Sequence, residues 1–249
     1  PSLWSVPADA RAEVWVPFQT RRGCPMGCTY CSTPLLEGTV MRKRLIGTVV
    51  EGIARHAAAG FRHFYCVDNT FNLPPRYAKD LCASLASAGL GIRFHCILYP
   101  GFVDEDLVRK MAEAGCIEAS LGFESGSPAL LRNLNKKYEV EQVRTASELL
   151  GKYGIRRTGF LLLGGPGETR ESVRESLEFA ESLRMEALKV TVGIRIYPGT
   201  ALEKTAREEG VIAEGDDLLY PRFYVARGLE EWIGPAVRQW MSGRPDCAV

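Results

Sequence analysis

The sequence predicts an α/β fold with parallel strands, arranged as a partial (β/α)6 TIM-like barrel. Four times an amphipathic stretch ends in Gly and an apolar run follows at once: at Ala59-Gly60-Phe61, Ala88-Gly89-Leu90, Ala114-Gly115-Cys116 and Tyr153-Gly154-Ile155. Because Gly just past a helix end takes the left-handed conformation that stops the helix, each junction indicates a helix followed by a strand. Strands alternating with helices of this length favour parallel strands joined by right-handed crossovers.

Six strands are expected, at residues 13–18, 62–67, 92–98, 117–122, 157–163 and 187–194. Between them apolar residues recur with helical spacing, as at Val49, Ile53 and Ala57. Helix starts are marked by the acidic turn 104–106 and by Thr200 with Glu203 three residues on, which predicts a capping box. Six β/α units fit this length, whereas a complete eight-unit barrel takes about 250 residues with tighter loops. A doubly wound open sheet is the alternative, since local sequence does not distinguish closure from a reversed strand order.

The expected organisation is a lead-in at residues 1–12, a core barrel at 13–210 and a less regular tail at 211–249 with one helix near 230–241. Of the 249 residues, 46% are hydrophobic, enough for one large core. The chain starts at Pro1 and not at Met, so we expect it to be a piece of a longer protein.

Charge and cysteine usage narrow the functional class. Lys and Arg total 31 against 30 Asp and Glu, so no global field attracts nucleic acid or an anionic membrane. Three of the eight cysteines cluster and the other five are scattered, which is unlike a secreted disulfide framework and favours a reducing cytoplasm. No run approaches the roughly 18 apolar residues of a membrane span.

The clustered cysteines, Cys24, Cys28 and Cys31, have C-x3-C-x2-C spacing and directly follow the first expected strand. A tetrahedral zinc site needs a fourth ligand, and the three histidines are distant in sequence. A 4Fe-4S cubane held by three thiolates leaves one iron open for another ligand. A zinc knuckle with a remote fourth ligand and an inert surface loop are the alternatives.

Other unusual segments follow later strands, so they should meet the cysteine loop at the carboxyl edge of the sheet. They are residues 68–72, 122–126, 164–169 and 197–200. Together with the cysteine loop, which has Tyr30 before its last cysteine, they resemble the radical S-adenosylmethionine (SAM) superfamily from about Val14 to Thr200. The resemblance implies that the three cysteines ligate a 4Fe-4S cluster whose open iron chelates SAM. One electron would then cleave SAM to a 5'-deoxyadenosyl radical that takes hydrogen from a substrate.

The resemblance also implies cofactor contacts at Tyr30, Asp68, Asn69, Thr70, Glu124, Ser125, Lys136, Gly164, Gly165, Pro166 and Arg195. Residues 68–70 stand where the family contacts the SAM amino group, although its usual Gly-Gly-Glu is absent. Glu124 and Ser125 match the position that holds the ribose and methionine parts of SAM. Lys136 matches a basic residue that can pair with the SAM carboxylate. Residues 164–166 would let the backbone approach adenine. No residue that acts on the substrate is implied.

Several short sequence segments resemble those of the branch of the superfamily whose members carry a cobalamin-binding domain. Among them are residues 19–24, 67–72 and 123–127. Its members methylate unactivated carbon or phosphorus, or rearrange rings. Cobalamin, bound through a domain absent from this chain, is therefore an implied cofactor. The resemblance also implies a reducing partner such as flavodoxin or ferredoxin. The substrate would be a small molecule of unknown identity. Alternatives are a methylthiotransferase acting on tRNA or a ribosomal protein, and a noncatalytic iron-sulfur electron-transfer module.

Structural roles compete with these assignments. Glu124 could satisfy the amides of residues 126–129 at a helix start, residues 136–137 could form a solvated face, and residues 164–167 could be a simple turn. The free Cys66, Cys96 and Cys116 are expected to be small buried hydrophobes, and His63 and His95 to be packed or hydrogen bonded. The run Arg42-Lys43-Arg44 is expected to be exposed, at a position that also suits an anionic substrate or an electron-donor protein.

Overall fold

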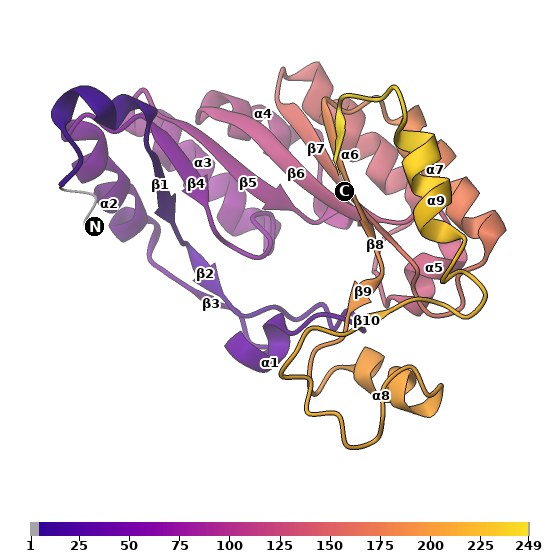
Figure 1. Ribbon diagram of the computed structural model, residues 1–249. Helices are drawn as coiled ribbons and strands as arrows, with labels where there is room; N and C mark the ends of the chain where they lie inside the picture. The colour runs from indigo at the N-terminus through magenta and orange to yellow at the C-terminus, as the bar shows by residue number, and fades with distance from the viewer. Residues whose placement is uncertain (1–4, 249) are drawn as a thin grey trace. The chain divides into compact units, whose positions relative to one another are not determined.

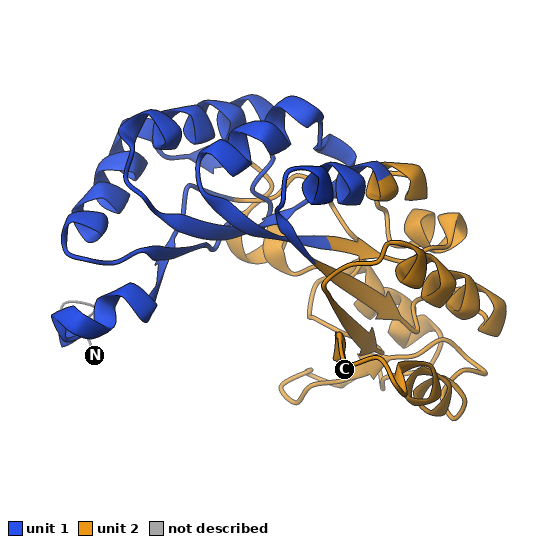
Figure 2. Cartoon of the chain, turned by 90° about the horizontal axis from the view of Figure 1, so that it is seen from above, with its two compact units in different colours: residues 1–22, 41–121, 145–157 blue, residues 23–40, 122–144, 158–249 orange. Residues whose placement is uncertain are grey.

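The computed structural model describes residues 5–248 and divides the chain into two compact units that interleave in sequence (Figure 2). The first unit comprises residues 1–22, 41–121 and 145–157, and the second residues 23–40, 122–144 and 158–249. Seven strands belong to the main parallel sheet, in the order β1-β4-β5-β6 and then β7-β8-β11. The parallel α/β architecture predicted from the sequence is confirmed.

The first unit is built of alternating strands and helices (Figure 1). Its elements are η2 (Ala8–Glu13), β1 (Trp15–Phe18), β2 (Arg21–Arg22), β3 (Arg42–Lys43), α2 (Ile46–Ala58), β4 (His63–Cys66), α3 (Pro75–Ala88), β5 (Arg93–Leu98), η3 (Pro100–Phe102), α4 (Glu105–Glu113), most of β6 (Cys116–Glu124) and most of α6 (Val140–Lys152). Parallel pairing aligns Trp15 with His63, and Tyr65 with His95. The short strands β2 and β3 form a separate antiparallel pair.

The second unit contains the remaining elements: α1 (Thr33–Glu37), α5 (Pro128–Asn133), β7 (Arg156–Leu163), α7 (Arg170–Ser182), β8 (Ala187–Val192), β9 (Ile194–Arg195), α8 (Ala201–Glu208), β10 (Phe223–Tyr224), α9 (Ile233–Met241) and β11 (Cys247–Ala248). Strand β8 pairs in parallel with β7 and with β11. Strands β9 and β10 form an antiparallel pair.

The core of the first unit lies where α2, α3 and α4 cover one face of its strands (Figures 1 and 2). Alternate residues of β4 and β5 are fully buried on this side: Phe64, Cys66, Phe94, Cys96 and Leu98. The free cysteines of the strands therefore pack as small hydrophobes, as expected, and burial raises the pKa of Cys66 and Cys96 well above its ordinary value. The two strand histidines lie on the opposite, half-exposed face.

Both histidines are packed, as expected. A ring nitrogen of His63 lies 2.6 Å from the carbonyl oxygen of Ala12. The His95 ring meets the Trp15 ring edge-on, with 3.8 Å between their centroids.

The expected helix starts are also found. The Asp104 carboxylate accepts a hydrogen bond from Leu107 N at the start of α4, and the Thr200 hydroxyl accepts one from Glu203 N at the start of α8. The Glu203 side chain accepts from Gly199 N at 2.6 Å, one residue before the position that a reciprocal capping box would use.

The last expected strand and the tail differ from the prediction in detail. The run at 187–194 is broken at Gly193, whose φ of 83° separates β8 from β9. The tail contains its expected helix, α9, and also the short strand β11, which extends the parallel sheet by pairing with β8. No helix within residues 5–248 has the length and apolar character to cross a membrane. The division into lead-in, core barrel and tail stays a prediction.

Candidate functional site

The three clustered cysteines lie in the second unit, on a loop that leads into α1. At the start of this loop, Cys24 N donates to Gly38 O at 3.1 Å and Gly23 N donates to Glu37 Oε2 at 3.0 Å. Gly23 has a φ of 89°, and a Cβ at this position would lie 2.3 Å from Val40 O. Only glycine therefore allows the two ends of the loop to approach so closely.

The middle of the cysteine loop is fixed by other parts of the second unit. Thr29 N donates to Leu134 O at 3.2 Å, and Thr29 O accepts from Leu202 N at 2.9 Å. The Asn135 side-chain amide donates to Gly27 O at 2.6 Å. These bonds hold the loop that carries the thiols without using the thiols themselves.

The donor atoms of the loop fit an iron-sulfur cluster. Three thiols share one short loop, and burial is the main cause that raises the pKa of both Cys24 and Cys28. Among residues 5–248, no three His, Cys, Asp or Glu side chains are grouped so that they could hold a metal ion. The thiolates that hold a cubane each bind a different iron, so they need not converge on one point as the ligands of a single zinc ion must.

Beside the last cysteine, three polar side chains form what we call the Tyr30–Glu124–Lys136 triad. The Tyr30 hydroxyl donates to Glu124 Oε1 at 2.9 Å, while Lys136 Nζ donates to the Tyr30 oxygen at 2.9 Å and to Glu124 Oε1 at 3.1 Å. The side chains of Lys136 and Glu124 are 4% and 14% exposed. Three residues that the sequence offered as separate cofactor contacts are thus directly bonded to one another.

The pKa shifts of Lys136 and Tyr30 indicate the charges of these two members of the triad. Burial is the largest single cause and lowers the pKa of Lys136. The charges of Glu124, Tyr138 and Cys28 and the hydrogen bond to Glu124 together outweigh it, so the pKa ends above its ordinary value. Burial, followed by the charge of Glu124, raises the pKa of Tyr30 well above 10. Near neutral pH Lys136 is therefore an ammonium and Tyr30 a neutral phenol.

Two structural alternatives for this region are wrong. Lys136 is not on a solvated face, because its side chain is nearly fully buried. Glu124 does not serve the following helix: its carboxylate bonds Tyr30 and Lys136, and the Ser125 hydroxyl accepts from Ser127 N at 3.0 Å instead. Glu124 itself ends β6 with a φ of 62°, which is rare for a residue with a side chain.

Ser125 and Arg195 lie outside the triad. Ser125 is fully buried, and its hydroxyl lies 2.8 Å from that of Ser176 in α7. Arg195 is exposed on β9, with its guanidinium 4.8 Å from the centre of the Tyr197 ring. Their contacts with a cofactor stay predictions.

At the Gly-rich end of β7, every polar backbone group of residues 164–166 has a hydrogen-bond partner. Gly164 N and Gly165 N both donate to the Glu168 carboxylate, the latter at 2.9 Å. The three carbonyl oxygens of residues 164–166 accept from Ala226 N, Glu168 N and the Asn133 side chain. Adenine contact at Gly164, Gly165 and Pro166 stays a prediction, and it would rely on the surface of this backbone more than on free N–H groups.

Glu168 is a residue to which the sequence assigned no role. It is 4% exposed, and burial raises its pKa to about 7. Its position four residues after Gly164, where a side chain can turn back to the strand end, is the sequence signal that could have identified it.

The residues after β4 belong to the first unit, where Asp68 organises its own cluster. Its carboxylate accepts from Thr20 N at 2.7 Å, from Arg21 Nε at 3.0 Å and from the Thr20 hydroxyl. Asp68 and Arg21 are 1% and 2% exposed, and the Arg21 guanidinium stacks 4.7 Å from the centre of the Tyr77 ring. Both Asp68 oxygens thus fix residues 20–21, which directly precede the cysteine loop.

Asn69 and Thr70 follow Asp68 and are half-buried. Like Asp68, they stay predicted contacts of the SAM amino group. Arg21 was not among the expected site residues, and nothing in the sequence separates it from the neighbouring Arg22.

Comparison with known proteins supports the chemistry of the cysteine loop. Residues 19–180 match the model of the radical SAM superfamily. An uncharacterized methyltransferase of Pyrococcus horikoshii is 31% identical over 206 residues, which cover 81% of this chain and 45% of that protein. A ribosomal protein uS12 methylthiotransferase of Dechloromonas aromatica is 25% identical over 185 residues, 66% of this chain and 41% of that protein.

Among solved structures, the radical SAM methyltransferase TsrM from Kitasatospora setae is similar in fold. Its structure with cobalamin and a 4Fe-4S cluster gives a TM-score of 0.76 at 25% identity, covering 78% of this chain and 37% of that one. Its structure with tryptophan and a SAM analogue gives 0.86 at 22% identity, covering 96% and 54%. This likeness confirms the predicted partial TIM-like barrel. The chain spans less than half the length of the two curated relatives described above.

Proposed function

Because the chain belongs to the radical SAM superfamily, we propose that it forms the core of an enzyme that reductively cleaves SAM at a 4Fe-4S cluster. The observation that carries this proposal is the triad, an ammonium, a carboxylate and a phenol held within 3.1 Å of one another directly beside the cysteine loop. A zinc knuckle or an inert loop would not need such a group. An electron-transfer module would not need it either.

In this proposal Cys24, Cys28 and Cys31 hold the cluster. When bound, the cluster and SAM supply one-electron cleavage of the sulfonium and a 5'-deoxyadenosyl radical. The protein keeps the loop in place through Gly23, through the hydrogen bond that Leu134 O accepts and through the one that the Asn135 side chain donates. Cluster retention therefore depends on the second unit as well as on the thiols.

The triad would orient the charged end of SAM. Lys136 presents a buried positive charge that suits the carboxylate, and Glu124 a negative charge that suits the amino group and a ribose hydroxyl. Since both side chains are already ordered and largely desolvated, little reorganisation is needed when the ligand binds. Tyr30 holds the two charges in register because it bonds both.

The end of β7 would provide the wall for adenine. Glu168 fixes the amides of Gly164 and Gly165, so this backbone presents a defined surface. A well-packed, water-excluding wall is what a reactive carbon radical requires.

We further propose methyl transfer assisted by cobalamin as the reaction class, with the cobalamin bound by a part of the protein outside this chain. The support is the likeness to a methyltransferase of Pyrococcus horikoshii and to TsrM, whose structure holds both cobalamin and a cluster. The methylthiotransferase relative keeps methylthiolation as the alternative. Cluster chemistry of this kind needs a reducing compartment, so we also propose a cytoplasmic location.

The test is anaerobic reconstitution with iron and sulfide, followed by reduction with dithionite in the presence of SAM. We expect an absorbance and iron content typical of one 4Fe-4S cluster and formation of 5'-deoxyadenosine. Cys28→Ala should lose both, whereas Cys247→Ala, a half-buried thiol at the other end of the chain, should keep both. A protein with an intact cluster that neither binds nor cleaves SAM would instead be an electron-transfer module.

A further inference from the structure

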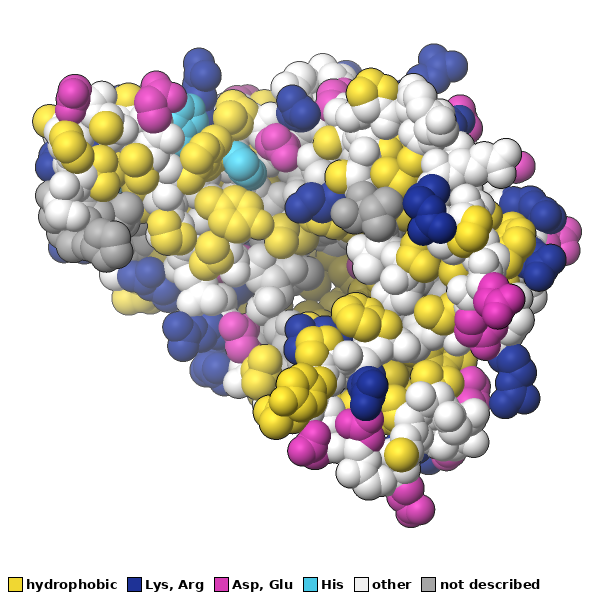
Figure 3. Space-filling view, viewed as in Figure 1, with side chains coloured by type: hydrophobic (Ala, Val, Ile, Leu, Met, Phe, Trp, Pro, Cys, Tyr) yellow, Lys and Arg dark blue, Asp and Glu magenta, His cyan; other side chains and the backbone are white. Residues whose placement is uncertain are grey.

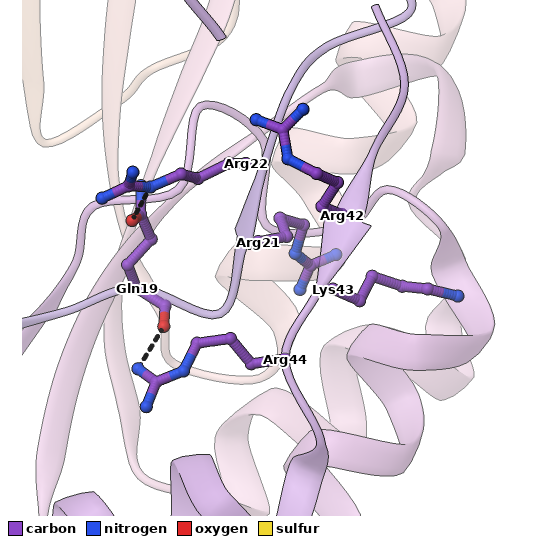
Figure 4. Close-up of a pocket in the computed structure, with 6 residues that line it drawn as sticks. All are labelled: Gln19, Arg21, Arg22, Arg42, Lys43 and Arg44. Carbon is purple, nitrogen blue, oxygen red and sulfur yellow. Dashed lines mark hydrogen bonds between the residues drawn. The ribbon is translucent and has the colours of Figure 1, made fainter. Parts of the chain in front are cut away.

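The first unit carries a groove lined by residues of the β2–β3 pair and its flanks, which we call the basic groove. It has a volume of about 400 Å³ and is lined by Gln19, Arg21, Arg22, Arg42, Lys43 and Arg44 (Figure 4). The antiparallel pairing places Arg22 directly opposite Arg42, and Arg21 opposite Lys43. In Figure 3, Lys and Arg side chains gather over the segment where Figure 1 labels these two strands.

Within the described chain, no carboxylate lines this groove, and none forms an ion pair with Arg22, Lys43 or Arg44. Arg22 donates to the Gln19 side chain at 2.8 Å and Arg44 to the Gln19 carbonyl oxygen at 3.1 Å, so both have neutral partners. Like charges directly opposite each other on paired strands destabilise a sheet. Arg21 is neutralised by its buried ion pair with Asp68. A protein with a net charge of only +1 thus still concentrates four further cations, Arg22, Arg42, Lys43 and Arg44, at one unfavourable place.

The directions of the side chains indicate what kind of anion fits. In Figure 4, Arg22 and Arg44 turn toward Gln19, whereas Lys43 extends away on the other side and Arg42 points elsewhere. A pocket for one phosphate would converge its cations on one point. Divergent cations match several carboxylates spread over the surface of an acidic protein.

The position of the groove indicates what such a protein would supply. Arg22 is two residues before Cys24, so their Cα atoms are at most about 7.6 Å apart along the chain. A partner seated on Arg22 therefore lies next to the loop that would hold the cluster. If the proposed function holds, this cluster must receive one electron from outside for each cleavage of SAM.

We propose that the basic groove docks an acidic one-electron donor protein of the flavodoxin or ferredoxin class; this inference rests on the proposed function. One electron leaves the reduced centre of the donor and enters the cluster, with no bond or proton transferred, so the donor is oxidised by one electron. Redox complexes of this kind have small, transient interfaces, and charge complementarity governs their rate of association. Salt therefore weakens the contact.

The experiment compares two reductants on the reconstituted holoenzyme. In the double variant Lys43→Glu/Arg44→Glu, we expect 5'-deoxyadenosine formation driven by reduced flavodoxin or by a reduced 2Fe-2S ferredoxin to fall about 10- to 100-fold at low salt. The rate with dithionite should not change. The matched control, Arg55→Glu/Arg76→Glu, changes the net charge by the same amount at two exposed positions of α2 and α3. It should behave like the wild type with both reductants.

A binding measurement separates this proposal from the proposed function. Calorimetry with oxidised flavodoxin and with oxidised ferredoxin needs no turnover, and for at least one donor the wild type should bind more tightly than the groove variant, with a difference that disappears at high salt. Equal binding by the groove and control variants, or no binding of either donor by the wild type, overturns the docking site. Tighter binding of a single-stranded oligonucleotide than of both donors at physiological salt would also overturn it, in favour of nucleic acid. Failure of dithionite to drive cleavage would count against the proposed function alone.

Discussion

Replacement of Lys136 by Met tests the triad most directly, because Met keeps an unbranched side chain only one atom shorter and removes the charge and the hydrogen-bond donors. In the wild type, Nζ lies 3.1 Å from Glu124 Oε1 and 2.9 Å from the Tyr30 oxygen, and the lysine side chain is 4% exposed. The variant leaves the Glu124 carboxylate without its cation. The Tyr30 hydroxyl remains as its partner.

The expected cost follows from this geometry. Removing one member of a buried ion pair typically costs about 3–5 kcal/mol, since the remaining charge is desolvated and unpaired. Glu124 keeps one hydrogen bond and is 14% exposed, so we expect the lower end, about 3 kcal/mol. Glu124→Gln removes the opposite charge, and the double variant Lys136→Met/Glu124→Gln should recover about 2 kcal/mol of the summed losses.

The assay is denaturant unfolding of the two single variants, the double variant and the wild type, all without cofactor. A coupling energy below about 0.5 kcal/mol would refute the view that the two side chains form a desolvated pair. Calorimetry with SAM on the reconstituted protein gives an independent result. There Lys136→Met should weaken binding about 10- to 100-fold, as expected for the loss of one charged hydrogen bond.

Two further predictions concern Glu168 and the start of the cysteine loop. Burial raises the pKa of Glu168 from 4.5 to about 7, so the folded state holds a proton that the unfolded state releases between these values. Its contribution to stability is therefore complete below about pH 4.5 and is lost as the pH rises through 7, by about 3 kcal/mol in total. Glu168→Gln should remove this pH dependence when unfolding free energies at pH 5 and pH 8 are compared, and an unchanged pH profile would contradict the assignment. Gly23→Ala should destabilise the protein by about 2 kcal/mol more than Gly210→Ala, because both glycines have positive φ but only the first would place Cβ against a carbonyl oxygen, 2.3 Å from Val40 O. Chemical denaturation checks this, and equal costs would show that the ends of the loop can separate.

The strands were predictable because their signals are local. A glycine that ends a helix and an apolar run that opens after it occupy neighbouring positions, so all six expected strands are found within a few residues. Strand β11 has only two residues, too few for any periodicity, and it forms because its backbone meets β8. Short edge strands of this kind depend on tertiary pairing and leave no pattern in the sequence.

The triad shows where the local signals stop. Glu124, Lys136 and Tyr30 could each be proposed from their positions in motifs, but their mutual bonds join residues up to 106 positions apart. The same limit applies to the first unit, where the sequence alone does not indicate which of the adjacent Arg21 and Arg22 is buried. Asp68 follows β4 and draws only Arg21 into the core, which leaves Arg22 exposed on the basic groove.

The opposite environments of Arg21, which is buried, and Arg22, which is exposed, link the core of the first unit to its basic groove. Arg21 and Asp68 bury a charge pair and fix the path of the chain immediately before the cysteine loop. Since adjacent side chains of a strand point to opposite faces, anchoring Arg21 inward forces Arg22 outward. One buried carboxylate therefore both positions the entry to the proposed cluster loop and orients a cation of the groove on which an electron donor would dock.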